Sequence, residues 1–322
     1  MPKVSVIIPV YGVEKYIERC CKSLFEQTLD EMEFLFIDDC TPDKSIDILN
    51  DILLTYPNRK GQVQILKMST NSGQAAVRRR GIIEAKGDYI IHCDSDDWVE
   101  PNMYKKMWEK AILEDLDIVL CDYYRSDGCN HKIVRKADKK AYQDRNIYFS
   151  MLIRGHVSTA IWNKLVRRDI YLTNNIIYPV YNMWEDFVLN MQLTYYSRRI
   201  GYINIPFYYY FDNKSSICYS GIEQRMSQVL ENSKLILNFL ISNGLDKIYE
   251  NELLSFKYYS RSELNLYVAE RKYRRMWRHI YPEINAKYCF SATIPFKEKL
   301  KFISIYCGIY PMIIRCMRIL KK

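Results

Sequence analysis

Three aspartates within four residues, Asp94, Asp96 and Asp97, follow an apolar run at 89–93 that predicts a buried strand. In an open α/β sheet, ligands bind at the edge where the strands end. Asp94 and Asp96, separated by one residue, can share Mg²⁺ or Mn²⁺, because these hard cations prefer oxygen ligands and keep positions open for substrate phosphates. The spacing therefore indicates a metal-diphosphate site. The alternative is an Asp/Ser-rich turn whose first aspartate caps the next helix.

The residues before this motif predict a parallel, doubly wound α/β sheet, because apolar runs of strand length alternate with helical patterns. The expected strands lie at 4–9, 34–37, 63–66 and 88–93. The expected helices cover about 13–27, the stretch opened by Thr41, Pro42 and Asp43, and the stretch from the polar loop 69–73 to Gly87. Polar side chains follow these strands and should meet at one carboxyl edge, namely Tyr11, Asp38, Asp39, Asn71, Asp94 and Asp96.

Two common nucleotide-binding motifs are missing from the sequence. No G-x-G-x-x-G follows the first strand and no G-x-x-x-x-G-K-[ST] loop occurs, so dehydrogenase and P-loop functions are not expected. The four histidines are dispersed without metal-binding spacing, and His92 is expected to be a strand residue. The ten cysteines lack C-x-x-C spacing, which favours a reduced, cytosolic protein. The N-terminus lacks the apolar core of a signal peptide, so export is not expected.

The second half of the chain is aromatic and mainly helical. Residues 123–144 are polar and basic and predict a loop or an edge hairpin. The other expected elements are helices at 101–114, 222–245 and 250–270, a helical region from Ile147 that includes 161–165 and 183–197, and strands at 117–121 and 202–211. We therefore expect one domain at 1–215 and a helical region at 216–322.

Together these motifs resemble the inverting, metal-dependent family 2 glycosyltransferases of the GT-A fold, over about residues 3–215. The resemblance rests on six elements in order and spacing: Val6 to Tyr11, Ile37 to Asp43, Asn71 to Gly73 with Arg78 and Gly81, Gly87 to Asp97, Trp162 to Lys164, and Glu185 with Asp186. It implies a doubly wound, mostly parallel sheet with helices on both faces, followed by a helical C-terminal extension.

The resemblance also implies which residues bind the nucleotide. The aspartate that contacts the base corresponds to Asp39, with Asp38 beside it, and the arginine near the nucleotide corresponds to Arg78. Three successive arginines point in three directions on a helix, so Arg79 and Arg80 are expected at the surface. The expected nucleotide-binding set is Pro9, Tyr11, Asp38, Asp39, Asn71, Arg78, Asp94 and Ser95.

Two further roles concern the metal and the reaction. The resemblance makes Asp96 the ligand of Mg²⁺ or Mn²⁺, where a cation stabilises the departing diphosphate. It makes Asp186, with Glu185 beside it, the catalytic residue that takes the acceptor proton. The alternative for this acidic pair is a plain helix start, where the helix dipole favours negative charge.

The sequence departs from the family pattern in two places. The usual Asp-Asp-Gly-Ser reads Asp-Asp-Cys40-Thr, and the residue after the helix arginine, often asparagine, is Arg79. Cysteine reaches positive φ at a higher energetic cost than glycine, which puts the shape of that loop in question. Trp162 and Trp184 could stack on sugar rings, although large aromatic side chains more often belong to a core.

The resemblance implies a transferase of the hexosyl or N-acetylhexosaminyl class with a nucleotide-diphospho-sugar donor, expected to be UDP-linked. The implied acceptor is a glycan or lipid-linked hydroxyl in the synthesis of a surface polysaccharide such as capsule or lipopolysaccharide. A nucleotidyltransferase would carry a glycine-rich, lysine-bearing loop after the first strand, and residues 9–12 are not one. A sugar-nucleotide-binding protein without turnover is the second alternative, and the joint presence of Asp94, Asp96 and Asp186 argues against it.

The C-terminal region is basic and apolar, in a chain with a net charge of +9. Residues 270–278 form a basic aromatic cluster, and 302–314 are almost wholly apolar between basic flanks. Interrupted by Gly308 and Pro311, this run falls short of the roughly 20 residues that cross a bilayer. We expect it to lie on an anionic membrane, with the protein peripheral on the cytoplasmic face of the plasma membrane. The alternative is a helix packed on the core. No nucleic-acid module accompanies the charge, so nucleic acid is not an expected partner.

Overall fold

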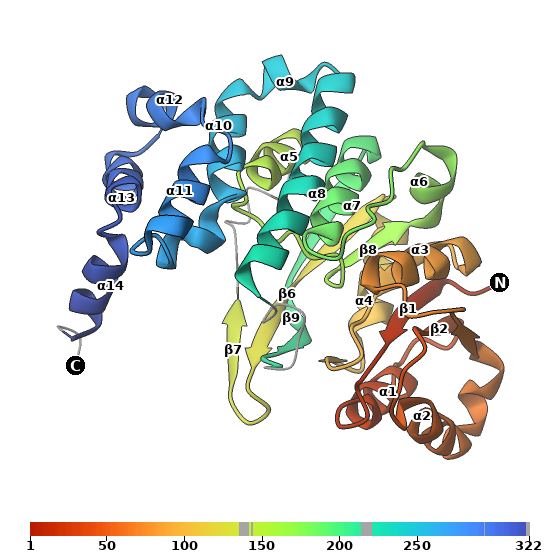
Figure 1. The fold of residues 1–322 in the computed structure, drawn as a ribbon. Helices are drawn as coiled ribbons and strands as arrows, with labels where there is room; N and C mark the ends of the chain where they lie inside the picture. Colours follow the sequence, from red (N-terminus) through yellow and green to blue (C-terminus); the bar gives the residue numbers. More distant parts are fainter. Residues whose placement is uncertain (135–141, 143, 214–220, 293, 320–322) are drawn as a thin grey trace. The chain divides into compact units, whose positions relative to one another are not determined.

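The four apolar runs at the start of the chain form neighbouring parallel strands of one sheet (Figure 1). The computed structural model describes residues 1–134, 142, 144–213, 221–292 and 294–319. Across the sheet, the strand order is β3-β2-β1-β4-β8-β6-β9-β5, and β7 pairs with β6. The strands are β1 Val4–Val10, β2 Met32–Asp38, β3 Val63–Lys67, β4 Tyr89–His92, β5 Trp98–Val99, β6 Ile118–Ser126, β7 His131–Val134, β8 Lys164–Arg167 and β9 Ile200–Phe211.

The sheet is mostly parallel, as the sequence predicts, with three antiparallel additions. β1 runs parallel to β2 and β4, β2 to β3, and β6 to β9. β8 is antiparallel to both β4 and β6, β5 to β9, and β7 to β6. The helical expectation for 161–165 is therefore wrong at its end, because residues from Lys164 enter β8. The hairpin considered for 123–144 is present as β6 and β7, while residues 135–141 and 143 lie outside the described residues.

Helices lie on both faces of this sheet. Those of the first part of the chain are α1 Ile17–Phe25, α2 Ser45–Leu54, α3 Gln74–Glu84, α4 Met103–Leu113, α5 Arg145–Ile153, α6 Arg168–Thr173 and α7 Glu185–Tyr196, with a 3₁₀ helix η1 at Pro57–Gln62. α1 is shorter than expected, because Val13 to Tyr16 form a turn in which the amides of Tyr16 and Ile17 both donate to the Val13 carbonyl.

Alternation along β1 assigns the two faces of the sheet. Val4, Val6, Ile8 and Val10 join a buried cluster with residues of α1, α2 and α4. The other face receives α3, which approaches closely at Gly81, where a Cβ atom would lie 2.4 Å from Cγ2 of Ile7. Side chains of β1 alternate between the two faces, and because both faces are covered, β1 is buried almost throughout, as in a buried parallel sheet.

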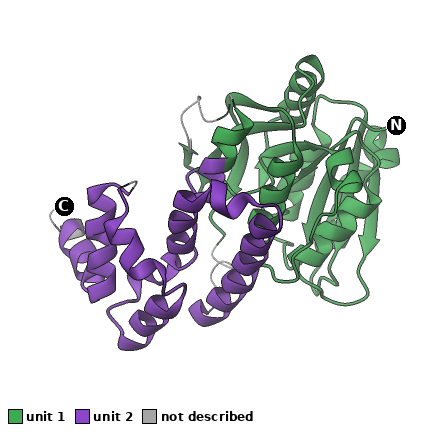
Figure 2. Cartoon of the chain, turned by 90° about the horizontal axis from the view of Figure 1, so that it is seen from above, with its two compact units in different colours: residues 1–149, 157–216 green, residues 150–156, 217–322 purple. Residues whose placement is uncertain are grey.

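Figure 2 shows the chain as two compact units, residues 1–149 with 157–216, and residues 150–156 with 217–322. The second unit is helical, and its core contains Trp277, Phe302 and Ile305. The helix expected at 250–270 ends at Tyr259, where a 3₁₀ helix follows. The helices that follow residue 217 in the second unit are α8 Ile222–Ser242, α9 Leu245–Ile248, α10 Glu250–Tyr259, η4 Ser262–Leu266, α11 Arg271–His279, α12 Ile284–Phe290, α13 Phe296–Cys307 and α14 Tyr310–Ile319.

The apolar C-terminal run is divided between α13 and α14, because Gly308 between them has a left-handed φ of 81°. Among the described residues, a helix with the length and apolar character to cross a membrane on its own is not found. α13 and the part of α14 up to Met317 meet those criteria only as a pair bent by 117°.

Candidate active site

The polar residues that follow β1, β2 and β4 emerge at one edge of the sheet. The strand register pairs Val10 with Asp38 and Ile7 with His92, so the chain leaves all three strands on the same side. Tyr11 is 50% exposed there, and Asp94 is half-buried. Pro9 is half-buried, Asn71 is exposed and Ser95 is buried. The structure therefore brings the expected nucleotide-binding residues to a common edge, and their roles stay predictions.

Asp38 and Asp39 shape the loops that surround this edge. Both carboxylates are buried. Asp38 accepts a hydrogen bond from the amide of Thr41 at 2.8 Å, and Asp39 accepts from the amides of Ser72 and Gly73 at 2.7 and 2.8 Å. Asp39 thus ties the end of β2 to the loop after β3. The two aspartates therefore hold the backbone of the loops after β2 and β3, and a nucleotide base would be an additional partner.

Cys40 takes the backbone shape that glycine would adopt more cheaply. Its φ is 57°, in the left-handed region that disfavours side chains. Its thiol donates to the Met68 carbonyl at 3.1 Å, a contact that glycine could not make. The departure from the family pattern therefore leaves the loop in a left-handed conformation and adds a tie to the segment after β3.

A contact far apart in sequence organises the start of α3. Gly73 precedes the helix with φ of 81°, and a Cβ atom there would lie 2.7 Å from Nδ2 of the Asn182 side chain. The Asn182 side-chain oxygen accepts a hydrogen bond from the amide of Ala75 at 3.1 Å, across 107 residues of sequence. Asn182 therefore satisfies one of the free amides of the first turn. Sequence reasoning missed this residue, because no local motif marks it.

Arg78 joins the D-x-D motif to the acidic start of α7. The guanidinium is 3% exposed and forms an ion pair with Asp94 at 2.5 Å and a second ion pair with Glu185. Gln74 also donates to Asp94, at 3.1 Å. In contrast, Arg79 and Arg80 are both exposed. Of three successive arginines, Arg78 is the one that lies in the site.

The hydroxyl of Tyr208 holds the backbone of the D-x-D motif. It accepts a hydrogen bond from the amide of Asp94 at 3.0 Å and donates to Asp97 at 2.6 Å. The other Asp97 oxygen accepts from the amide of Phe211 at 2.7 Å. Burial, together with the charges of neighbouring aspartates, holds the pKa of Asp97 well above its usual range. Asp97 therefore anchors the motif to β9 and is not a surface carboxylate.

Asp96 is held by partners that the sequence did not identify. Asn213, just after β9, donates to its carboxylate at 2.8 Å, and Arg19 of α1 donates to its backbone carbonyl at 3.0 Å. Arg19 also lies over the Trp98 ring at 3.6 Å. Burial, and next the charge of Asp94, raises the pKa of Asp96.

This crowding of negative charge fits a divalent cation. Burial, and next the neighbouring carboxylates, raises the pKa of Asp96 and Asp97, so a cation at Asp96 would favour the ionised forms. Within the described ranges, no group of three His, Cys, Asp or Glu side chains is placed to hold a metal by itself. A hard ion here would share its coordination between Asp96, water and phosphate oxygens of a ligand, which is the usual arrangement for Mg²⁺.

Glu185 and Asp186 differ in what they contact. Glu185 is 2% exposed and is engaged by Arg78. Asp186 is half-buried and accepts a hydrogen bond from the amide of Phe187 at 2.8 Å. Burial raises the pKa of Asp186, and the nearby Arg78 charge opposes the shift. A raised carboxylate pKa suits a general base, so Asp186 fits that part and Glu185 fits a positioning part.

Three aromatic residues near the site contribute to its packing or backbone shape: Trp162 and His92 are buried, and Trp184 has a left-handed φ. Trp162 is 7% exposed and stacks on Tyr208 at 4.2 Å, so it supports the residue that holds the D-x-D backbone. Trp184 directly precedes α7 with a left-handed φ of 68°, a strained conformation next to the candidate base. His92 is buried in β4, as expected, and burial and then the Arg78 charge lower its pKa well below the usual range.

Replacing Tyr208 by Phe tests whether its hydroxyl holds the site together. Tyr208→Phe should lower the free energy of unfolding by about 1–3 kcal/mol, because a buried carboxylate and a buried amide lose their partner. Urea denaturation measures this loss. Tyr209→Phe is the matched control, since the Tyr209 hydroxyl donates to Glu100 from a half-buried position. Equal losses in the two variants would contradict the anchoring role of Tyr208.

Comparisons with known proteins agree with this geometry. Residues 5–171 match the model of glycosyl transferase family 2. EpsH of Bacillus subtilis (strain 168) is 31% identical over 265 residues, which cover 79% of this chain and 74% of EpsH. Among solved structures, S. aureus TarS 1–349 in complex with UDP-GlcNAc has a TM-score of 0.70 at 19% identity, covering 96% of this chain and 88% of TarS.

A second solved structure carries a metal. The mannosyltransferase PcManGT from Pyrobaculum calidifontis, in complex with GDP-Man and Mn²⁺, has a TM-score of 0.56 at 10% identity, covering 98% of this chain and 86% of that one. At these identities the two structural matches establish a shared fold. The family match, which spans more than half of the chain, establishes more: this chain belongs to glycosyl transferase family 2.

Proposed function

We propose that this glycosyltransferase moves a sugar from a UDP-linked donor to a hydroxyl of a glycan or lipid-linked acceptor, with inversion, during synthesis of a cell-surface polysaccharide. One observation carries the proposal. Arg78 links Asp94, on the expected donor side, to Glu185, next to the candidate base. This link supports the proposal, because it would hold the donor side and the catalytic side of a transfer site together. The UDP-GlcNAc bound by TarS supports the choice of nucleotide.

The donor would occupy the carboxyl edge. Asp38 and Asp39 would face the base, while Pro9, Tyr11, Asn71 and Ser95 would line the nucleotide, and Arg78 and Asp94 would lie near its ribose and phosphates. Asp96 would hold Mg²⁺ or Mn²⁺, which when bound supplies positive charge against the departing diphosphate. The buried and neighbouring carboxylates of Asp96 and Asp97 support this placement: burial, and next the charges of nearby aspartates, raise the pKa of both, and a cation would favour their ionised forms.

The acceptor would lie against Asp186. Its carboxylate takes the hydroxyl proton as the acceptor oxygen bonds to the anomeric carbon, and the bond from that carbon to the diphosphate oxygen breaks on the opposite side. One displacement inverts the anomeric centre and releases the nucleoside diphosphate. Glu185 does not share this role, because its ion pair with Arg78 fixes it as a positioning residue.

Removing the Asp186 charge tests the transfer step. Asp186→Asn should lower kcat by about 10²–10⁴-fold, the usual contribution of a general base, and leave UDP affinity unchanged. Product formation from a UDP-sugar and calorimetric UDP binding measure the two quantities. Asp169→Asn is the matched control, because Asp169 is an exposed acid in the first turn of α6. Wild-type activity in Asp186→Asn would show that Asp186 only begins a helix.

The same reaction should have a pH dependence set by Asp186. The base works when ionised, so kcat/KM should fall as the pH drops through its pKa. Because burial raises that pKa, the decline should begin at a higher pH than for an ordinary aspartate. This acidic limb should be missing from the residual activity of Asp186→Asn. A wild type that binds UDP but never turns over would instead favour a binding protein.

We further propose that α13 and α14 rest on an anionic membrane at the cytoplasmic face. α13 has two apolar sides: Phe302 and Ile305 are buried in the core, while Leu300 and Ile303 are 51% and 46% exposed. Met312 on α14 is 66% exposed. Packing on the core therefore uses only part of the apolar surface. The remainder lies in a segment with flanking basic residues at 297, 299, 301 and 315, a combination suited to anionic lipid.

Vesicle sedimentation tests this membrane surface. The protein should bind phosphatidylglycerol-containing vesicles and not pure phosphatidylcholine vesicles, because both apolar and charged contacts are needed. Leu300→Asp should reduce the bound fraction sharply. Leu113→Asp is the control, since Leu113 is an 85% exposed leucine on α4 in the other unit. Equal binding by both variants would locate the lipid contact elsewhere or show that there is none.

A further inference from the structure

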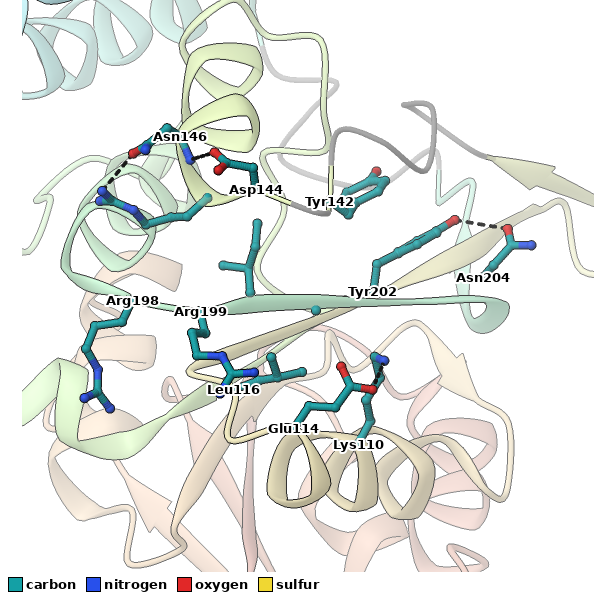
Figure 3. A pocket seen from close by; sticks show the side chains of 13 residues that line it. Lys110, Glu114, Leu116, Tyr142, Asp144, Asn146, Arg198, Arg199, Tyr202 and Asn204 are labelled. Carbon is teal, nitrogen blue, oxygen red and sulfur yellow. Dashed lines mark hydrogen bonds and ion pairs between the residues drawn. The ribbon is translucent and has the colours of Figure 1, made fainter.

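A pocket, drawn in Figure 3, lies at the edge of the sheet where β6 and β9 begin, which is the opposite edge from Asp94. β8 is antiparallel to β4 and β6, so β6 runs in the same direction as β4, and β9 is parallel to β6. The pocket is built around the starts of β6 and β9, together with the end of α4 and the start of α5. Its volume is about 730 Å³, which is sufficient for an oligosaccharide segment.

The pocket has an excess of positive charge. Its cations are Lys110, Arg145, Arg198 and Arg199, and its acids are Glu114 and Asp144. Both acids are already engaged: Glu114 pairs with Lys110 at 2.5 Å, and Asp144 accepts from two backbone amides at the start of α5. The arginines before β9 are both exposed, and the closest approach of Arg198 to Asp117 is 3.7 Å. Arg198 thus forms a long, solvent-exposed ion pair with Asp117, and the exposed guanidinium of Arg199 is the group most available to an anion.

The turn that carries these arginines is fixed. Asp117 is 3% exposed and accepts hydrogen bonds from the amides of Arg198 and Arg199 at 2.7 and 3.4 Å. Its other oxygen pairs with Arg167 at 3.0 Å. The backbone beneath the arginine pair is therefore held in place, and binding of an anion would not have to order the turn. Arginine in such a setting can bind a carboxylate or phosphate through two parallel hydrogen bonds.

The rest of the lining suits a sugar. Figure 3 shows Tyr142, Tyr202 and Asn204 on a different side of the pocket from the arginines. Tyr142 and Tyr202 stack at 4.2 Å, and the Tyr202 hydroxyl donates to Asp122 at 2.6 Å, so the Tyr202 ring is held on one face and at its hydroxyl. Aromatic rings can contact the apolar face of a sugar, and a side-chain amide such as that of Asn204 can bind its hydroxyls.

We propose that this pocket binds an anionic saccharide, a carboxylate- or phosphate-bearing segment of a glycan. Arg199 would take the acidic group, with Arg198 beside it, and Tyr202 and Asn204 would contact the neighbouring ring. Because the pocket and the donor edge lie on opposite sides of the sheet, both can be filled at once. That the saccharide is a distant part of the acceptor rests on the proposed function, whereas binding itself does not.

Calorimetric titration with hexagalacturonate, a carboxylate-bearing hexasaccharide, tests the site without any donor or turnover. Wild type should bind it, with no comparable heat for the neutral maltohexaose or for inorganic phosphate. Arg199→Glu should weaken binding by at least about tenfold, because a favourable charge becomes repulsive. Lys60→Glu makes the same charge change at an exposed residue away from the pocket and should leave binding unchanged.

Three outcomes would overturn the proposal. Equal weakening in both variants would show attraction by net charge alone. Equal binding of maltohexaose would remove the need for an acidic group. Binding of inorganic phosphate as tight as that of the hexasaccharide would show a simple anion site. UDP binding, measured on the same Arg199→Glu sample, should match wild type, so a failure here stays separate from a failure of the donor site.

Discussion

The buried guanidinium of Arg78 is the interaction on which the site depends. A charge at 3% exposure is costly unless it is paired, and its two partners, Asp94 and Glu185, come from segments 16 and 107 residues away. Removing one member of such a group leaves uncompensated buried charge, at a cost of about 3–5 kcal/mol. The same contact that satisfies Arg78 therefore fixes the D-x-D motif against the start of α7, where Asp186 lies.

The arrangement concentrates negative charge at the sheet edge and controls how that charge is balanced. Arg78 compensates Asp94, while Tyr208 and a backbone amide bind Asp97, whose raised pKa shows that ionisation is disfavoured. Asp96 accepts a hydrogen bond from Asn213, and burial together with the charge of Asp94 raises its pKa, which is why we propose it as the residue that holds a cation. The contacts of Arg78, Tyr208 and Asn213 with these carboxylates therefore have two effects: they stabilise the buried charges, and they fix the positions of the carboxylates in the proposed site.

The sequence predicted the first four strands and the polar residues that follow them, because period and strand ends are local properties. It also selected Arg78 from three arginines, which the burial of Arg78 alone among them supports. The contacts of Asn182 and Tyr208 could not be predicted, because they join residues more than 100 positions apart and no local motif marks them. β8 was missed for a related reason: four residues give too short a pattern, and its sheet neighbours make it a strand.

Calorimetric titration of UDP, with and without Mn²⁺, against wild type and Asp96→Asn measures most directly whether the acidic edge is a metal-dependent donor site. The charge balance at this edge predicts tight binding by wild type only when Mn²⁺ is present, and loss of that metal dependence in Asp96→Asn, with the fold intact by circular dichroism. GDP run in parallel tests the choice of base. Equal UDP affinity with and without Mn²⁺, or an Asp96→Asn variant that responds to Mn²⁺ like wild type, would contradict the assignment of Asp96 and of the edge as a metal-diphosphate site.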